Sequence, residues 1–167
     1  MTLGGNDLAA LAQRRSDGAS TASLWADTEE LIDEMRRGAR WLKDPDRFEE
    51  EVSVVMSNLI EFTDATGDTS ACPAASLAGF GQTISDPDIA QMVVYTLEQY
   101  MALAVETGSD MLFLQETFCG HGFARDDPAG RCYQGPGAQL WFDLTCVHPN
   151  PRGHKEIAKM IVSVVDV

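Results

Sequence analysis

Segments long enough for amphipathic helices alternate with short apolar runs, and this alternation constrains the fold more than any other feature of the chain. Residues 22–43 and 85–108 place apolar side chains at helical spacing, and Pro151 opens a third segment of that kind. Between them lie two short runs that favour β-strands, 52–56 and 111–114. Strands that alternate with helices are typical of a parallel sheet covered by helices, so the sequence predicts an α/β fold.

The remaining internal segments are predicted to be mostly loop. Residues 13–21 are polar, residues 64–85 are rich in small and polar side chains, and residues 115–138 contain several glycines. Residues 44–50 are predicted to form a short helix, because Asp44 is a suitable N-cap and Pro45 suits the first helical position. Loops as long as the two large ones are usually functional or disordered.

The position of these loops after candidate strands predicts where a site should lie. Residues 2–4 are predicted to end a further strand, which a Gly-Gly-Asn-Asp turn follows. In an open sheet of this class, ligands bind beyond the carboxyl ends of the strands. We therefore expect this turn, the loops 64–85 and 115–138, and the histidine-containing loop at 143–150 to converge on one rim.

The composition excludes several classes of partner. A length of 167 residues suits a single domain, and the net charge of −14 is strongly acidic. Nucleic acids and anionic membranes would repel such a chain, so neither is expected as a partner. No run of 18 apolar residues predicts a transmembrane segment, and the first residues lack the pattern of a signal peptide.

Four cysteines allow three disulfide pairings, and their positions favour one pair. Cys119 and Cys132 flank a glycine-containing loop and are the favoured pair, while Cys72 and Cys146 form either a second pair or two buried thiols. Two disulfides would imply an oxidising compartment, so the full-length protein is expected to be secreted or periplasmic.

Two motifs near the ends of the chain carry a family resemblance. The first is Leu3-Gly-Gly-Asn-Asp7, and the second is Asp143-Leu-Thr-Cys-Val-His148 followed by Pro-Asn-Pro. Together they resemble the third and fifth motif blocks of the SGNH (GDSL) hydrolases, which are serine esterases and lipases with a three-layer, flavodoxin-like α/β fold. The resemblance implies that residues 1–167 are the C-terminal part of one such domain, without its N-terminal strands. It also implies hydrolysis of a small-molecule or lipid carboxylic ester without a cofactor.

The resemblance assigns roles to three residues. His148 would be the general base, because an imidazole can take a proton from a serine hydroxyl and return it to the leaving group. Asn6 would donate a hydrogen bond to the oxyanion, and loss of such a donor typically costs roughly 10²–10³ in rate. The family usually has its acid three residues before the histidine, where this chain has Thr145. The group that orients the imidazole is therefore either Asp143 or a backbone carbonyl.

The serine of the family is not among these residues. In the family it belongs to a Gly-Asp-Ser block that, together with a glycine block, precedes Gly-Gly-Asn-Asp, and neither block occurs here. Residues 67–69 (Gly-Asp-Thr) imitate the first block, but they lie downstream of Asn6 and carry threonine. We therefore expect a fragment that is inactive by itself, whose missing strands would leave a sheet edge open to self-association.

Further residues on the expected rim have other possible uses. His121 and Phe123 are candidates for lining a substrate site. His121 could be drawn into a zinc site with Cys119, Cys132 and His148, but the spacing matches no familiar zinc pattern, and no metal is expected. The alternative to an enzyme is a non-catalytic, acidic α/β module that binds a partner through its rim loops.

Overall fold

The computed structural model of the protein describes residues 5–50, 52–72, 74 and 86–165. Their elements are, in chain order, α1 (Gly5–Ser16), α2 (Thr21–Leu42), β1 (Val55–Ser57), the 3₁₀ turn η1 (Thr69–Ala71), α3 (Pro87–Thr107), β2 (Asp110–Leu112), α4 (Leu114–Phe118) and α5 (Pro151–Val165). Strands β1 and β2 pair in parallel, with Val55 opposite Asp110 and Ser57 opposite Leu112. The described part is thus a mixed α/β structure with a small parallel sheet, as the alternation predicts at the level of fold class.

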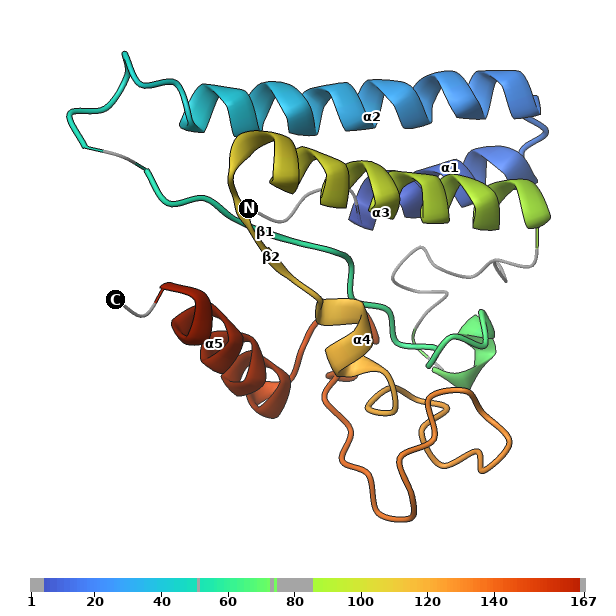
Figure 1. Cartoon of the computed structure of the whole chain (residues 1–167). Helices are drawn as coiled ribbons and strands as arrows, with labels where there is room; N and C mark the ends of the chain where they lie inside the picture. The colour runs from blue at the N-terminus through green and yellow to red at the C-terminus, as the bar shows by residue number, and fades with distance from the viewer. Residues whose placement is uncertain (1–4, 51, 73, 75–85, 166–167) are drawn as a thin grey trace.

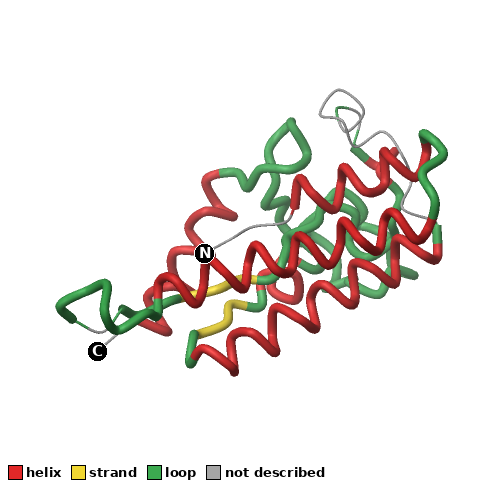
Figure 2. Tube along the Cα trace, turned by 90° about the horizontal axis from the view of Figure 1, so that it is seen from above, coloured by secondary structure: helices red, strands yellow, loops and turns green. Residues whose placement is uncertain are grey.

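The helices lie on both sides of the two strands (Figure 1). Helices α1, α2 and α3 lie side by side above the strands, as the view from above also shows, and α5 lies below them (Figures 1 and 2). The core between α2, α3 and β1 is apolar and buried, and its members are Met35, Ala39, Val54, Met56, Tyr100, Leu103 and Ala104. Burial of this common core is the main force that holds the helices on the sheet.

The two longest helices confirm the predictions made from the periodicity of their apolar side chains. Helix α2 begins after Ser20, whose hydroxyl accepts a hydrogen bond from the backbone N–H of Ser23 at 3.2 Å. Helix α3 begins at Pro87 after the N-cap Asp86, and Gly108 ends it in a left-handed conformation with φ of 60°. Local signals of this kind act within a few residues, which is why the sequence alone locates these helix ends.

Three predicted segments differ from the structure. Helix α1 includes residues 13–16, which were expected to be loop, because Arg15 bonds Asp86 at 2.7 Å and thereby holds the last turn of α1 against the start of α3. Residues 44–50 form turns rather than a helix, because so short a segment has little packing to offset its ordering entropy. The predicted strand 52–56 begins only at Val55.

The second predicted strand is also shorter than expected. Residues 110–112 pair with β1, but the chain then turns into α4 at Leu114 instead of continuing the strand. The side chain of Asn58 accepts a hydrogen bond from the backbone N–H of Gln115 at 3.0 Å. This contact satisfies one of the free N–H groups at the start of α4, and nothing in residues 111–118 alone signals it.

The Gly-Gly-Asn-Asp motif does not form the expected turn in its described part. Gly5, Asn6 and Asp7 are the first residues of α1, while residues 1–4 lie outside the described residues, as do residues 75–85 of the predicted long loop. A Cβ atom added to Gly5 would lie 3.8 Å from Leu59 Cδ2. The start of α1 therefore lies next to the segment that leaves the carboxyl end of β1.

Helix α5 forms where Pro151 predicts it, but its apolar face is only partly covered. Ile157 packs against the cluster around Phe118, whereas Ile161, Val162 and Val165 are 40%, 54% and 40% exposed. Among the described residues, none of the helices combines the length and the apolar character of a membrane span.

All four cysteines are paired. Cys119 bonds Cys132, as the spacing favours, and Cys72 bonds Cys146. Of the two alternatives for Cys72 and Cys146, the structure contains the second disulfide rather than two buried thiols. Both disulfides are compatible with an extracellular protein.

Candidate functional site

Loops that are far apart in sequence meet beyond the carboxyl ends of β1 and β2. They share a buried cluster formed by Phe62, Cys72, Phe118, Trp141, Phe142 and Cys146. Backbone hydrogen bonds join the loops directly, from Phe123 N–H to Phe62 O and from Trp141 N–H to His121 O, both at 2.9 Å. The described parts of the loops after β1 and α4 and the histidine loop thus converge on one rim, as the position of ligand sites in open α/β sheets leads one to expect.

Asp64 ties two of these loops together. Its side chain is buried, and its carboxylate accepts hydrogen bonds from the backbone N–H groups of Gly120 and Gly122 at 2.8 Å and of Ala124 at 3.0 Å. A Cβ atom at residue 122 would lie 2.3 Å from Phe62 O, so only glycine permits this approach. No local pattern in the sequence marks Asp64 for this role, because its partners lie 56 to 60 residues away.

The histidine loop is closed by its own backbone. Asp143 N–H donates to His148 O at 2.9 Å, and Phe142 and Pro149 form an isolated antiparallel bridge. Cys146 has a left-handed φ of 73°, and its N–H donates to Asp143 O at 3.1 Å. The disulfide from Cys146 to Cys72 attaches the tip of the loop to the segment after β1. The loop is therefore held in shape at both its base and its tip.

Within this loop, a hydroxyl lies between the histidine and the acid. The distance from His148 Nδ1 to Thr145 Oγ1 is 2.8 Å, and Thr145 Oγ1 donates to Asp143 Oδ1 at 2.5 Å. Among the described residues, no hydrogen bond joins Asp143 to the His148 side chain directly. Within the described part of the chain, neither of the two orienting groups expected from the sequence hydrogen-bonds the imidazole, whereas Thr145, which stands at the family's usual acid position, does.

Asp143 is the charged member of this arrangement. The hydrogen bond from the Thr145 hydroxyl is the largest influence on the Asp143 carboxyl and lowers its pKa. Burial, the next largest, opposes this shift, while the Thr145 backbone N–H and the nearby His148 and His154 lower the pKa further. Asp143 is therefore ionised at neutral pH. The arrangement can hold an imidazole in one orientation beside a carboxylate, which is what a general base requires.

His121 and Phe123, the candidates for lining a substrate site, both lie on the rim. The His121 ring stacks on Trp141, with centroids 3.5 Å apart and planes within 4°, and its Nδ1 lies 2.8 Å from Gln139 O. Phe123 meets Phe62 edge to face at 6.4 Å. Both residues are partly buried and partly accessible. Their contacts show how the rim is packed, and a substrate role for either remains a prediction.

Asn6 is exposed in the first turn of α1. The neighbouring Gly5 lies next to Leu59, so Asn6 is at the end of the sheet from which the rim loops depart. Among the described residues, no hydrogen bond connects Asn6 with His148, so a site shared by these two residues remains a prediction.

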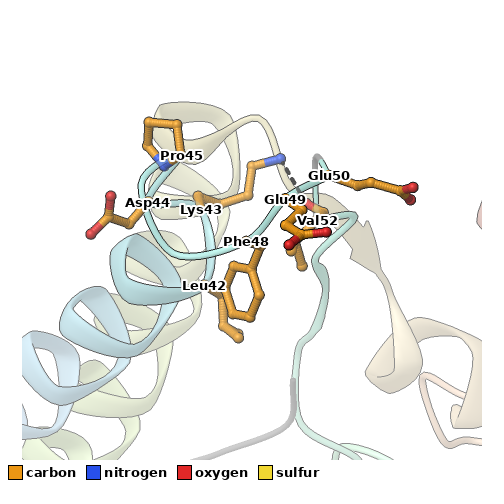
Figure 3. A pocket seen from close by; sticks show the side chains of 8 residues that line it. All are labelled: Leu42, Lys43, Asp44, Pro45, Phe48, Glu49, Glu50 and Val52. Atoms are coloured by element: carbon orange, nitrogen blue, oxygen red, sulfur yellow. Dashed lines mark hydrogen bonds between the residues drawn. The ribbon is translucent and has the colours of Figure 1, made fainter.

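The cavity between the end of α2 and the start of β1 lies away from these residues. It has a volume of about 410 Å³ and is lined by Leu42, Lys43, Asp44, Pro45, Phe48, Glu49, Glu50 and Val52. Figure 3 shows Lys43 reaching across to Val52 O, at 3.2 Å. Because the cavity precedes β1, it lies at the amino end of the strand, whereas the histidine loop belongs to the carboxyl-end rim. None of the residues proposed for chemistry lines it.

The residues described include no group of three or more His, Cys, Asp or Glu side chains that could hold a metal ion. No family model matches the chain, and no curated protein and no solved structure matches it either. A functional assignment therefore depends on the residues themselves and on their geometry.

Proposed function

We propose that the chain carries the general-base part of a serine-dependent carboxylic ester hydrolase of the SGNH type. The observation that carries the proposal is the exposed imidazole of His148, held at Nδ1 while no described residue bonds Nε2. A nitrogen that is free and exposed on a rim of loops can accept a proton from a serine hydroxyl and return it to the leaving alcohol.

Two further features support this function. Helices lie on both sides of the parallel strands, which is compatible with a three-layer fold (Figure 1). The apolar side chains of Ile161, Val162 and Val165 on α5 are exposed, and a helix face of this kind commonly covers more of a sheet than two strands provide. In this proposal the serine and the first strands belong to polypeptide outside these 167 residues.

The remaining groups complete the proposed reaction. Asn6 donates its side-chain N–H to the oxyanion of the tetrahedral intermediate, and His121 and Phe123 line the acyl or alcohol side of the ester. The net charge of −14 disfavours polyanionic substrates, so we propose a neutral small-molecule or lipid ester. With two disulfides in the structure, we propose that the full-length enzyme is secreted or periplasmic.

The test begins with the coding sequence upstream of the Met1 codon, read in the same frame. We expect a Gly-Asp-Ser block followed by a glycine block, and we expect the extended polypeptide to hydrolyse p-nitrophenyl esters. His148→Ala should lower kcat/KM by about 10²–10⁴, and Asn6→Ala by roughly 10²–10³. Lys155→Ala replaces an exposed side chain of the neighbouring helix and is the control, for which the rate should change little.

The 167-residue chain provides the second arm of the test. We expect no ester turnover from it, because the nucleophile is not among its residues. Turnover that His148→Ala abolishes would contradict this expectation and would place the nucleophile within the chain. An extended polypeptide that folds but hydrolyses no ester would favour the alternative function, an acidic binding module that uses the same rim loops.

A further inference from the structure

The hydrogen bonds of Thr145 determine which nitrogen of His148 carries its proton. A carboxylate oxygen can only accept, and Asp143 Oδ1 lies 2.5 Å from Thr145 Oγ1 and 2.8 Å from the Thr145 backbone nitrogen. The single hydroxyl proton of Thr145 is therefore directed at Asp143. Toward His148 the hydroxyl oxygen has only lone pairs left, so it accepts a hydrogen bond from Nδ1–H across 2.8 Å.

We infer that Thr145 is a positioning residue that fixes His148 as the Nδ1–H tautomer and leaves Nε2 as the free proton acceptor. In the hydrolases that this chain resembles, a carboxylate three residues before the histidine usually makes this contact, and here a neutral hydroxyl replaces it and connects the imidazole to Asp143. The inference deepens the proposed function, on which its catalytic meaning rests, but the tautomer is a property of the loop itself.

The surroundings of the loop hold this hydrogen-bond chain in place. Cys146 adopts its left-handed conformation between Thr145 and His148 and is bonded to Cys72, and Asp143 N–H closes the loop on His148 O. The titratable groups that face Asp143 are His148 from the same loop and His154 from α5. When Nε2 takes up a proton, Thr145 Oγ1 still accepts from Nδ1–H, and the carboxylate beyond it stabilises the positive charge.

The 167-residue chain, with its disulfides intact, is sufficient for the test. Long-range ¹H–¹⁵N NMR spectra of the imidazoles at neutral pH report which nitrogen is protonated in each histidine. For His148 we expect a pyrrole-like Nδ1 and a pyridine-like Nε2. A dominant Nε2–H form in the unmodified chain would overturn the inference before any variant is made.

Two substitutions separate the hydroxyl from the rest of the side chain. Thr145→Val keeps the shape and the backbone N–H bond to Asp143 but removes the hydroxyl, so the Nδ1–H form should lose its dominance. Thr145→Ser restores the hydroxyl and should restore that form. Thr117→Val is the control on α4. It removes a hydroxyl that donates a hydrogen bond to Phe113 O, and it should leave the His148 signals unchanged. A folded Thr145→Val chain with the original tautomer would show that Thr145 does not position the imidazole.

The two proposals can fail separately. A Thr145-dependent tautomer, combined with an extended polypeptide that hydrolyses no ester, would remove the proposed function and leave the positioning role. Ester hydrolysis that depends on His148 but not on Thr145, measured as kcat/KM of the Thr145→Val extended polypeptide, would leave the function and remove the positioning role. If both hold, Thr145→Val should lower kcat more than it raises KM, and Thr145→Ser should recover most of the loss.

Discussion

At the scale of single residues, the rim depends on side chains that bond distant backbone. Asp64 combines burial, a left-handed φ of 53° and three backbone N–H donors from the 120–124 segment. A buried carboxylate is stabilised only when its oxygens are well bonded, and here both are. The residue therefore serves as the link between the loop after β1 and the loop after α4.

Asp64→Ala should lower the free energy of unfolding by about 3 kcal/mol or more, because three backbone N–H groups lose a charged acceptor. Asp64→Asn should be milder, since asparagine keeps one acceptor oxygen and tolerates a left-handed φ. Urea unfolding followed by circular dichroism measures both. Asp68→Ala is the matched control, because Asp68 is exposed and its carboxylate bonds Ser70 of its own loop and no other described residue. Equal losses for Asp64→Ala and Asp68→Ala would contradict the link.

At the scale of the elements, α5 is attached to the rim chiefly through its first turn. Asn150 is the N-cap, since its Oδ1 accepts from the N–H groups of Arg152 at 2.9 Å and Gly153 at 3.0 Å. Its Nδ2 donates in the other direction, to Leu140 O at 2.7 Å and Phe142 O at 3.2 Å. One amide thus caps the helix and holds the segment that leads into the histidine loop.

Asn150→Ala should lower the free energy of unfolding by about 2 kcal/mol, because it loses the cap and the two bonds to carbonyl groups. Asn150→Asp keeps the cap but turns a carboxylate oxygen toward those carbonyl groups, so it should also destabilise the protein. Thermal unfolding compares the two variants. Ser20→Asp changes an N-cap whose hydroxyl bonds Ser23 N–H and no second group in the described part of the chain, so it should be nearly neutral. An Asn150→Asp protein as stable as the unmodified chain would mean that the cap alone matters.

At the scale of the whole molecule, two disulfides close loops of very different length. Cys72 and Cys146 are 74 residues apart in sequence, whereas Cys119 and Cys132 are 13 apart. In the chain-entropy description, a cross-link stabilises the folded state more when it closes a longer loop of the unfolded chain. The first disulfide also connects the histidine loop with the segment after β1.

The double variant Cys72→Ala/Cys146→Ala should therefore lose about 1.5 kcal/mol more stability than Cys119→Ala/Cys132→Ala. Thermal or urea unfolding of the two double variants under identical conditions provides the comparison, and each serves as the control for the other. Of the two, only Cys72→Ala/Cys146→Ala should also change the NMR signals of His148. Equal destabilisation by the two double variants would show that strain or residual structure outweighs loop entropy.

The sequence by itself determined the features that arise within one segment. Helices α2 and α3 follow from the spacing of their apolar residues, because the hydrogen bonds of a helix connect residues only a few positions apart. Asp86 and Gly108 at the two ends of α3 are signals of the same short range. The start of α5 at Pro151 and the pairing of Cys119 with Cys132 are local in the same sense. The α/β class follows from the order of these segments.

Only the tertiary structure decided how the rim is built. Thr145 and His148 are three residues apart, but their contact requires the left-handed turn at Cys146, which is bonded to Cys72 at a sequence separation of 74. Asp64 likewise bonds glycines that the chain reaches only after α3, β2 and α4. Such contacts depend on which loops the packed helices and strands bring together. No pattern within a loop encodes them, because the free energy of forming them comes from the fold as a whole.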